Sequence, residues 1–402
     1  MTDAVWITRT YPWRDQPNFG VFYQTQARAL ARLGVSMTVA CPTPWAPWPL
    51  SRLRSRWRDY AATPRRALDE GVSVVRPRYL NVPGEPTWAR PDRLIADAMW
   101  RSRRDWAGAR LIHGHYSVTG LAAWHLAERT GLPFVLTFHG SDMNSWPDEY
   151  PERVADLTSA VGRAGAVFAV SEALARRVHD VTGVMPVHLP LGSDHRSLVA
   201  GAMPRADARS LLGLPMDAVV VLFVGNLKPT KGVRELAEAI LSVGRPFLGV
   251  FVGSGSEEGQ GLDDARAPGL LEYRGPQAHE DVIRYMSAAD VLVLPSHLEG
   301  LPTVLVEAGS LGLPVIASAV GGIPELLGSD RGSILPDVSP GSIAAALTHF
   351  ADHRGEAEAA AGRLRELVLR DYDVDTNAAR LLDWYRSVAA DFPGPHGREA
   401  AS

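Results

Sequence analysis

The chain has only two lysines, Lys228 and Lys231, and both lie in one glycine-bounded loop. This loop, residues 225–232 (GNLKPTKG), joins an apolar run to an amphipathic stretch, so we expect it to lead from a β-strand into a helix. Glycines let the backbone approach an anion, and a helix N-terminus with an ammonium group stabilises phosphate. We therefore predict that Lys231 binds phosphate. An ordinary solvated loop is the alternative interpretation, because exposed lysines are common.

A second loop, residues 295–307 (PSHLEGLPTVLVE), carries two carboxylates. Pro302 stands where the start of a helix tolerates proline, so the amides of residues 303–305 are expected to be free to bind phosphate. Glu299 precedes this helix and Glu307 lies about a turn inside it. One ligand could therefore touch both acids and the amides. Carboxylates accept hydrogen bonds from hydroxyls, and a nucleotide sugar carries hydroxyls on both sides of its pyrophosphate.

Short β-rich apolar runs alternate with amphipathic stretches in both halves of the chain. This alternation predicts strands and helices that would position the two loops. Predicted strands in the first half are 4–8, 36–40, 72–75, 111–113, 134–138, 166–170 and 185–189, with helices at 21–33 and 121–130. Predicted strands in the second half are 219–224, 247–252, 270–273, 291–294 and 315–317, with helices at 233–242, 279–288 and 303–311. The pattern predicts an α/β protein with two Rossmann-like parallel-sheet domains.

Glycines and prolines between residues 190 and 217 predict a linker with one short helix. We expect an N-terminal domain over 1–195 and a C-terminal domain over 196–374. A closing helix is expected over 375–392, with Asp375 as its N-cap, followed by a disordered tail over 393–402. The Asp-x-Asp pattern at Asp371 and Asp373 is one that metal-dependent transferases of another fold use. Its position just before the closing helix favours capping.

Both halves of the chain contain short motifs whose order and spacing along the sequence can be compared with known families. Glu299-x7-Glu307 follows the lysine loop and precedes Gly321-Gly-Ile-Pro-Glu325, while the first half adds Gly20-Val-Phe, His113-Gly-His115-Tyr116 and Thr137-Phe-His139-Gly-Ser141-Asp142. Together these motifs, which span nearly the whole chain, resemble the retaining group 1 (family four) glycosyltransferases. The resemblance implies a GT-B fold, with two Rossmann-like domains facing each other across a cleft and a C-terminal helix closing back on the N-terminal domain.

The activity that the resemblance implies is transfer of a hexosyl-type sugar from a nucleoside-diphosphate sugar, with retention of configuration. The acceptor would be a hydroxyl of a glycan, a lipid-linked or a small-molecule compound, in cell-envelope polysaccharide or glycoconjugate biosynthesis. No cofactor is implied beyond the UDP- or GDP-linked co-substrate, and no metal.

Roles carried over from the family make His139, Lys231 and Glu299 the catalytic group. Glu299 would hold hydroxyls of the transferred sugar, Glu307 the ribose, and Lys231 the pyrophosphate. The remaining implied donor-binding residues are Gly20, Asn226, Gly253 (with Gly255), Arg274, Pro276, Gly300, Leu301, Pro302, Thr303 and Val304. The implied acceptor side comprises His115, Tyr116, Ser141 and Asp142. Asn226 departs from the arginine of many relatives, so either Lys228 or Arg234 compensates or the diphosphate is held less tightly.

The histidines allow a second interpretation. His113 and His115 alternate on one strand face and, with His139, could form a three-histidine zinc site. We favour their lining a cleft and predict a metal-independent enzyme. His139 as a core histidine and Asp142 as a helix cap also stay open.

Composition limits the compartment and the partners. The N-terminus has no signal-peptide pattern and Cys41 is the one cysteine, so we expect a cytoplasmic protein. Residues 1–194 carry 23 arginines against 18 acids, whereas the rest is acidic. Arginines flank Leu50, Leu53, Trp57 and Tyr60 within residues 50–66, which could contact an anionic inner-leaflet membrane. A solvated helix that packs Trp57 on the domain is the alternative.

Three functions remain open from the sequence: the transferase, a sugar-nucleotide epimerase of related fold, and a noncatalytic nucleotide-sugar-binding protein. Nucleic acid is not expected as a partner, because no recognisable binding module accompanies the arginines.

Overall fold

The computed structural model describes residues 3–13, 19–45, 55–81, 91–257 and 269–391. The chain forms two compact units: unit 1 is Met1–Leu191 with Val374–Ser402, and unit 2 is Gly192–Asp373. The predicted boundaries, after residues 195 and 374, lie close to these. The predicted tail over 393–402 lies outside the described residues.

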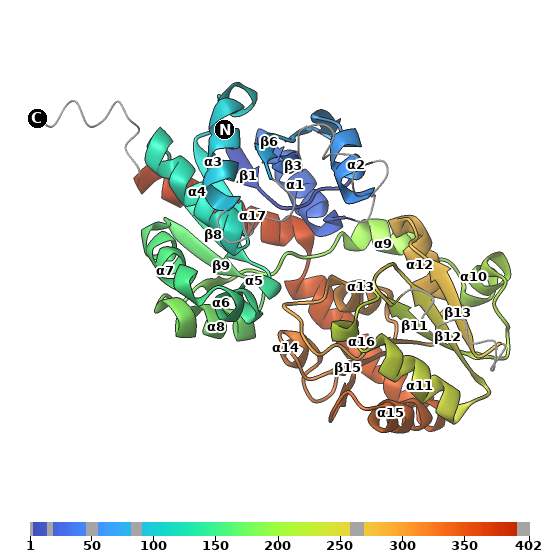
Figure 1. The fold of residues 1–402 in the computed structure, drawn as a ribbon. Helices are drawn as coiled ribbons and strands as arrows, with labels where there is room; N and C mark the ends of the chain where they lie inside the picture. The colour runs from blue at the N-terminus through green and yellow to red at the C-terminus, as the bar shows by residue number, and fades with distance from the viewer. Residues whose placement is uncertain (1–2, 14–18, 46–54, 82–90, 258–268, 392–402) are drawn as a thin grey trace, which may run out of the picture. The chain divides into compact units, whose positions relative to one another are not determined.

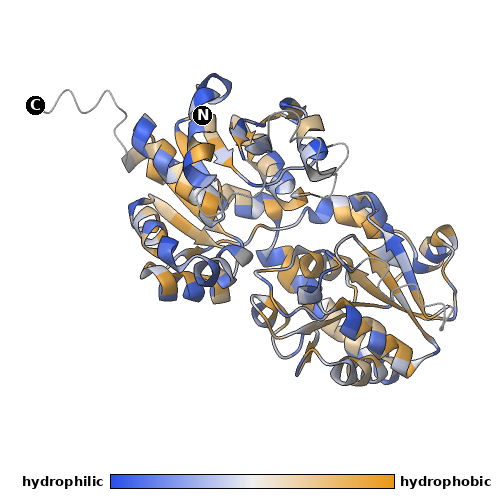
Figure 2. Cartoon of the chain, viewed as in Figure 1, coloured by the Kyte–Doolittle hydropathy of each residue, from blue (hydrophilic) through white to orange (hydrophobic). Residues whose placement is uncertain are grey.

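Unit 1 is built on an eight-stranded sheet in the order β10-β9-β8-β7-β1-β2-β5-β4, which is parallel except for β4. Its strands are β1 (Ala4–Ile7), β2 (Met37–Ala40), β4 (Arg66–Asp69), β5 (Val72–Val75), β7 (Leu111–His115), β8 (Phe134–Phe138), β9 (Ala166–Ala169) and β10 (Val187–His188). Buried apolar runs form the inner strands, as expected for a sheet covered on both faces (Figure 2). The sequence analysis did not predict β4, nor the two-stranded sheet of β3 (Thr43–Trp45) and β6 (Arg78–Leu80).

The helices of unit 1 follow the strands in the usual βα alternation. They are α1 (Val21–Arg32), α2 (Ser55–Ala62), α3 (Pro91–Arg101), α4 (Ser117–Thr130), α5 (Ser141–Asn144), α6 (Trp146–Glu149), α7 (Val154–Arg163) and α8 (Glu172–Thr182), with the short 3-10 helices η3 (Arg103–Trp106) and η4 (Pro151–Arg153).

The last helix of the chain, α17 (Val374–Asp391), belongs to unit 1, where Figure 1 shows it beside β1 and α1. Its apolar face joins the core of that unit, and the indole Nε1 of Trp6 in β1 donates to the hydroxyl of Tyr385 over 2.8 Å. The predicted closing helix is therefore present. Asp375 lies in its first turn rather than at the N-cap, and it forms a 2.5 Å ion pair with Arg32 of α1.

Unit 2 contains a six-stranded parallel sheet in the order β13-β12-β11-β14-β15-β16. Its strands are β11 (Val219–Val224), β12 (Phe247–Val252), β13 (Leu271–Gly275), β14 (Val291–Leu294), β15 (Val315–Ser318) and β16 (Ser333–Leu335). The first strand lies in the middle, so the strand order reverses between β11 and β14. Open α/β sheets bind ligands at such a point.

The helices of unit 2 are α9 (His195–Gly201), α10 (Arg205–Leu212), η5 (Pro229–Lys231), α11 (Val233–Val243), α12 (His279–Ala288), α13 (Thr303–Leu311), α14 (Ile323–Leu327), α15 (Pro340–Asp352) and α16 (Arg354–Asp371). The linker that was predicted to hold one short helix holds two, α9 and α10. Among the described residues, no helix is both long and apolar enough to cross a membrane.

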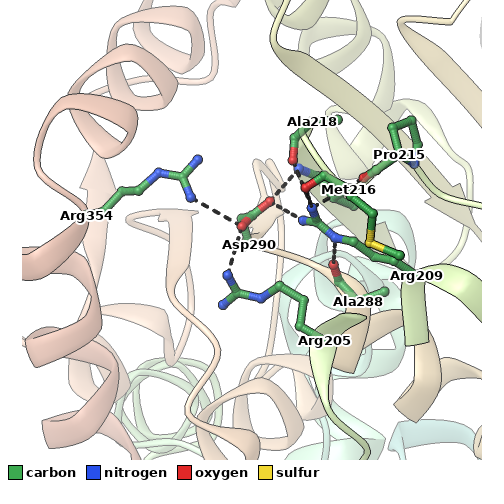
Figure 3. Close-up of polar contacts among 9 residues, drawn as sticks. Arg205, Arg209, Pro215, Met216, Ala218, Ala288, Asp290 and Arg354 are labelled. Atoms are coloured by element: carbon green, nitrogen blue, oxygen red, sulfur yellow. Dashed lines mark hydrogen bonds and ion pairs between the residues drawn. The ribbon is translucent and has the colours of Figure 1, made fainter. Parts of the chain in front are cut away.

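A buried ionic cluster fixes the amino ends of β11 and β14 (Figure 3). The carboxylate of Asp290, which directly precedes β14, accepts hydrogen bonds from the Val220 amide over 2.7 Å and from Arg209 over 2.6 Å. Arg205 and Arg354 approach the same carboxylate at 3.2 and 3.4 Å. Because Asp290 directly precedes β14 and accepts from the Val220 amide in β11, this cluster joins the two strands at their amino ends, and removing Asp290 would leave the buried Arg209 without its carboxylate. The opposite ends of these strands carry the lysine and glutamate loops.

Candidate active site

Lys231 and Glu299 meet where the strand order of unit 2 reverses. Lys231 ends the short helix η5 after β11, and Glu299 lies in the loop after β14. The ammonium nitrogen is 2.6 Å from Oε1 of Glu299, and the hydroxyl of Ser296 donates to the same oxygen over 2.7 Å. The carboxylate is almost fully buried, whereas the lysine side chain keeps 23% of its surface exposed. The sequence analysis had not selected Ser296, although its place directly after a buried strand was a signal.

Glycines let the surrounding loops approach one another. A Cβ on Gly232, which has φ of +65°, would lie 2.1 Å from the Pro295 carbonyl oxygen, and one on Gly253 would lie 1.8 Å from that of Gly225. No side chain fits at either position. The His297 amide also donates to the Thr230 carbonyl over 2.9 Å, so the lysine and glutamate loops form one unit.

Gly321 and Gly322, in the loop after β15, pack against the backbone of the Glu299 loop. The Gly322 amide donates to the Gly300 carbonyl over 2.7 Å, and a Cβ on Gly321 would lie 2.3 Å from the Glu299 carbonyl oxygen. The motif that the sequence resemblance included therefore has a structural role here. It fixes the backbone from which the Glu299 side chain extends.

The helix that follows, α13, begins at Thr303 with Pro302 directly before it, and Gly300 and Leu301 complete the loop. Within the described chain, the Thr303 and Val304 amides form no backbone hydrogen bond. The prediction that the Leu305 amide is also free is wrong, because it donates to the Pro302 carbonyl over 3.1 Å. Two amides, rather than three, are left to bind an anion.

Glu307 lies one turn into α13. Burial raises the pKa of its carboxyl above the ordinary value, and the charge of His279 at the start of α12 partly opposes that rise. The side chain is half-buried, so its carboxyl oxygens can accept hydrogen bonds from ligand hydroxyls.

Arg274 and Pro276 lie where β13 ends. The Gly253 amide donates to the Gly275 carbonyl over 2.9 Å, so this loop is joined to the loop after β12. The Arg274 guanidinium pairs with Glu272, and the Gln277 side chain donates to the Arg274 carbonyl. The side-chain charge of Arg274 is thereby largely offset, which leaves backbone groups of this loop as the available contacts.

Asn226 is exposed in the lysine loop. Of the two residues expected to compensate for its lack of charge, Arg234 forms a 2.6 Å ion pair with the buried carboxylate of Glu257. Lys228 is exposed and, in the described structure, forms no ion pair. Lys228 is therefore the better-placed candidate.

Three histidines stack in unit 1 at the ends of β7 and β8. The rings of His113 and His115 are 4.0 Å apart, and Nδ1 of His115 lies 3.1 Å from Nε2 of His139. Burial lowers the pKa of all three imidazoles, that of His139 to about 3. Neutral rings can stack at this distance without charge repulsion.

The arrangement does not resemble a zinc site. His113 bonds through Nδ1 to the Tyr385 hydroxyl at 2.5 Å and through Nε2 to the Thr137 hydroxyl at 2.7 Å, so neither nitrogen is available to a metal. Among the described residues, no three His, Cys, Asp or Glu side chains are grouped to hold a metal ion. Sequence spacing could not have revealed Tyr385, which reaches this site from the last helix.

The other predicted residues of unit 1 lie near His139. The ring of Tyr116, whose φ is +67°, is 4.8 Å from the imidazole. Asp142 accepts hydrogen bonds from the His139 and Gly140 amides over 3.1 and 2.6 Å, and burial raises the pKa of its carboxyl to about 7. Ser141 starts α5, but its side chain lies outside the described residues.

Gly20 is the residue before α1, with φ of +92°. A Cβ there would lie 2.7 Å from the Thr10 hydroxyl, so its backbone faces a tight loop that excludes any side chain.

The basic segment predicted at residues 50–66 is described only in part. Residues 50–54 and the side chain of Arg56 lie outside the described residues, whereas Trp57 on α2 is buried and packs edge-on against Tyr60 at 5.9 Å. Trp57 is therefore a packing residue and does not serve as an exposed aromatic anchor.

Comparisons with known proteins agree on one family. A model described as "Glycosyl transferases group 1" matches residues 205–365, and one described as "Glycosyltransferase Family 4" matches residues 20–194. The putative teichuronic acid biosynthesis glycosyltransferase TuaC of Bacillus subtilis is 34% identical over 387 residues, which cover 96% of this chain and 98% of TuaC. D-inositol 3-phosphate glycosyltransferase of Streptomyces scabiei is 31% identical over 319 residues, which cover 71% of each chain.

Solved structures show the same fold. Sucrose-phosphate synthase from Thermosynechococcus elongatus has a TM-score of 0.79 at 20% identity, covering 97% of this chain and 100% of that one. Anabaena HepE, solved with UDP-glucose, has a TM-score of 0.72 at 18% identity, covering 96% and 100%.

Proposed function

Because the chain belongs to the group 1 glycosyltransferases, we propose that it transfers a hexosyl-type sugar from a nucleoside-diphosphate sugar to an acceptor hydroxyl. Its two parallel-sheet units have the GT-B fold. The transfer proceeds with retention of anomeric configuration and requires no metal.

The observation that carries this proposal is the Lys231–Glu299 pair at the strand-order reversal of unit 2. Departure of a nucleoside diphosphate develops negative charge, which fixed positive charge must stabilise. Lys231 has N–H donors besides the one directed at Glu299, and these donors, together with the two free amides at the start of α13, supply that stabilisation. Glu299, held by Ser296, is then placed to accept hydrogen bonds from hydroxyls of the transferred sugar.

The acceptor proposal rests on unit 1 and on the relatives. His115, Tyr116, His139 and Asp142 gather at the carboxyl ends of β7 and β8, where a parallel sheet binds ligands. TuaC is named for teichuronic acid biosynthesis, and we propose for this chain an acceptor of the polysaccharide or glycoconjugate class. We further propose that it acts on the cytoplasmic side, with contact to an anionic inner-leaflet membrane through residues 50–66.

An assay with labelled UDP- and GDP-sugars, with and without envelope glycans or lipid-linked saccharides as acceptors, tests the proposal. We expect diphosphate release that depends on an acceptor, a product whose anomeric proton shows retention, and unchanged rates in chelator. HepE was solved with UDP-glucose, so UDP-sugars come first, with the GDP series in parallel. Formation of a donor epimer, or donor binding without turnover across the acceptor panel, would contradict the transferase.

A further inference from the structure

Unit 1 has a concave site that is lined mainly by arginines and lies apart from the residues around His139. A cavity of about 610 Å³ is lined by side chains from the edge strand β4, the segment after β5, and the end of α3 with η3. Its lining residues are Arg65, Arg66, Arg76, Pro77, Arg78, Ala98, Arg101, Ser102 and Asp105. We call this the arginine pocket. All its residues belong to unit 1, whereas the proposed donor residues Lys231 and Glu299 belong to unit 2.

The charges of the arginine pocket are not balanced. Asp105 is the one acid among its lining residues, and it pairs with Arg66. Arg65, Arg76, Arg78 and Arg101 form no ion pair with any acid in the described part of the chain. Four guanidinium groups, which remain charged at any physiological pH, thus face one cavity without a counter-ion.

The backbone forces two of these arginines together. β4 pairs antiparallel with β5, with Arg66 opposite Val75, and the Arg76 amide continues the ladder by donating to the Arg65 carbonyl over 2.8 Å. Arg65 and Arg76 therefore stand opposite each other on the same face. Like charges in that position destabilise a sheet.

The deeper arginines are oriented by carbonyl groups. The buried Arg76 guanidinium donates to the carbonyls of Pro12 and Pro64 over 3.2 and 3.4 Å. Arg78 donates to carbonyls at the end of α2, including that of Thr63 over 2.8 Å. Burial lowers the pKa of both groups, and the charges of Arg65 and Arg76 lower that of Arg78 further. Carbonyls fix the direction of a guanidinium but do not neutralise it.

We propose that the arginine pocket binds a soluble molecule carrying a phosphate or diphosphate group. Guanidinium groups form charge-assisted hydrogen bonds with phosphate oxygens, and several of them around one cavity favour an anion with more than one charge. The volume falls within the range of small-molecule sites, so there is room for an organic body beside the phosphate. A bound dianion would offset the repulsion that Arg65 and Arg76 exert on Arg78.

Protection from arginine modification tests the proposal site by site. The full-length protein is treated with phenylglyoxal, with and without millimolar sodium pyrophosphate, and adducts are located by mass spectrometry. Arg65, Arg66 and Arg101 are exposed to the reagent, and we expect pyrophosphate to protect them. The exposed Arg104 and Arg110, which do not line the cavity, serve as internal references and should react equally in both samples. If each of the five arginines reacts to the same extent with and without pyrophosphate, the proposal is overturned.

Two further arms sharpen the result. In Arg101→Gln, the pyrophosphate concentration that half-protects Arg65 should rise about tenfold, as expected for one lost charge-assisted contact, whereas the matched Arg110→Gln should leave it unchanged. Vesicles of phosphatidylglycerol replace pyrophosphate in the last arm, with phosphatidylcholine as reference. Protection by anionic vesicles but not by pyrophosphate would overturn the soluble ligand and assign Arg65, Arg66 and Arg101 to the membrane contact that is proposed for residues 50–66.

Discussion

The ammonium nitrogen of Lys231 lies 2.6 Å from Oε1 of Glu299, although the two residues are 68 positions apart in the sequence. They meet because β11 and β14 are hydrogen-bonded neighbours, so that their following loops emerge side by side at the reversal of strand order. With Glu299 almost buried, neither charge can be removed without affecting the other. The pair should therefore act as one unit in donor binding and in turnover.

A double-mutant cycle measures that coupling. Lys231→Met and Glu299→Gln should each lower kcat/KM at least about 100-fold, the scale expected when charge stabilisation of a leaving group is lost. The double variant should lose much less than the product of the two single effects, because contacting residues are not additive. Steady-state kinetics with the active donor gives all four values.

Lys228→Met is the matched control for the cycle, since it removes the only other lysine from the same loop. Lys228 is exposed and not joined to Glu299, so even as the charge that compensates for Asn226 its loss should cost about tenfold or less, against at least about 100-fold for Lys231. Wild-type kinetics in Lys231→Met would show that this pair is structural.

Gly232→Ala tests whether the approach of the two loops matters to turnover. Gly232 and Gly213 share the left-handed conformation, with φ and ψ of +65° and +28° at Gly232 and of +67° and +32° at Gly213, so alanine costs about 1–2 kcal/mol of backbone strain at either position. A Cβ at Gly232 would also meet the Pro295 carbonyl oxygen at 2.1 Å, whereas one at Gly213 meets nothing within 4 Å. We expect Gly213→Ala to lower the unfolding free energy alone, and Gly232→Ala to lower kcat/KM at least about tenfold as well.

Equal kinetics in the two glycine variants would contradict this prediction. Urea unfolding of both proteins separates the strain that they share from the steric clash at Gly232.

Much of the fold could be predicted from the sequence where local pattern decides the structure. The strands at 219–224, 247–252 and 291–294 and the helix at 303–311 lie where the apolar periodicity predicted them. Continuous apolar runs identify buried parallel strands, and Pro302 marks a helix start. The exposed edge strand β4 was missed because its sequence, RALD, has no apolar run, and it is held by pairing to β5 alone.

Contacts between distant segments could not be predicted from local pattern. Asp290 with its three arginines, Tyr385 on His113, and Arg234 on Glu257 each join parts of the chain that only the topology brings together. The occupied Leu305 amide has a different and local cause, because it bonds to the Pro302 carbonyl three residues before it and helix-start geometry decides which amides stay free. The residue types at the proposed donor site could be predicted from the sequence, but their hydrogen-bond and ion-pair partners could not.

Acid should destabilise the histidine site of unit 1. Burial lowers the pKa of His113, His115 and His139, that of His139 to about 3, so below the unfolded value near 6.5 the unfolded chain binds more protons at these histidines than the folded protein does. Their contribution to stability is complete above 6.5 and is lost as pH falls, by up to about 1.4 kcal/mol per pH unit for each histidine. Hydrogen exchange of β7 and β8 amides at pH 5 and 7, corrected for intrinsic rates, should show this loss.

Two variants should change that acid sensitivity in opposite directions. His139→Gln removes one depressed pKa and should reduce it. Asp142 has a raised pKa, about 7, so its contribution is present at low pH and is lost as pH rises toward 7; Asp142→Asn should therefore make the acid loss steeper. His349→Gln, at an exposed position on α15 of unit 2, is the control and should change nothing. An unaltered pH dependence in His139→Gln would show that His139 titrates normally.

Asn226→Arg should tighten diphosphate binding. Asn226 is exposed in the lysine loop, and the nearby Arg234 forms a 2.6 Å ion pair with Glu257. Because Glu257 is already paired, we expect a guanidinium added at position 226 to be available to the diphosphate. One new charge-assisted contact is worth about 1.4 kcal/mol, or tenfold in Kd for UDP or GDP by calorimetry.

Asn226→Gln lengthens the side chain without charge and should leave Kd unchanged. Arg234→Gln should also have little effect, because its charge is already offset. If Arg234→Gln instead weakens binding tenfold while Asn226→Arg does nothing, then Arg234 leaves Glu257 when the diphosphate binds and is itself the compensating charge.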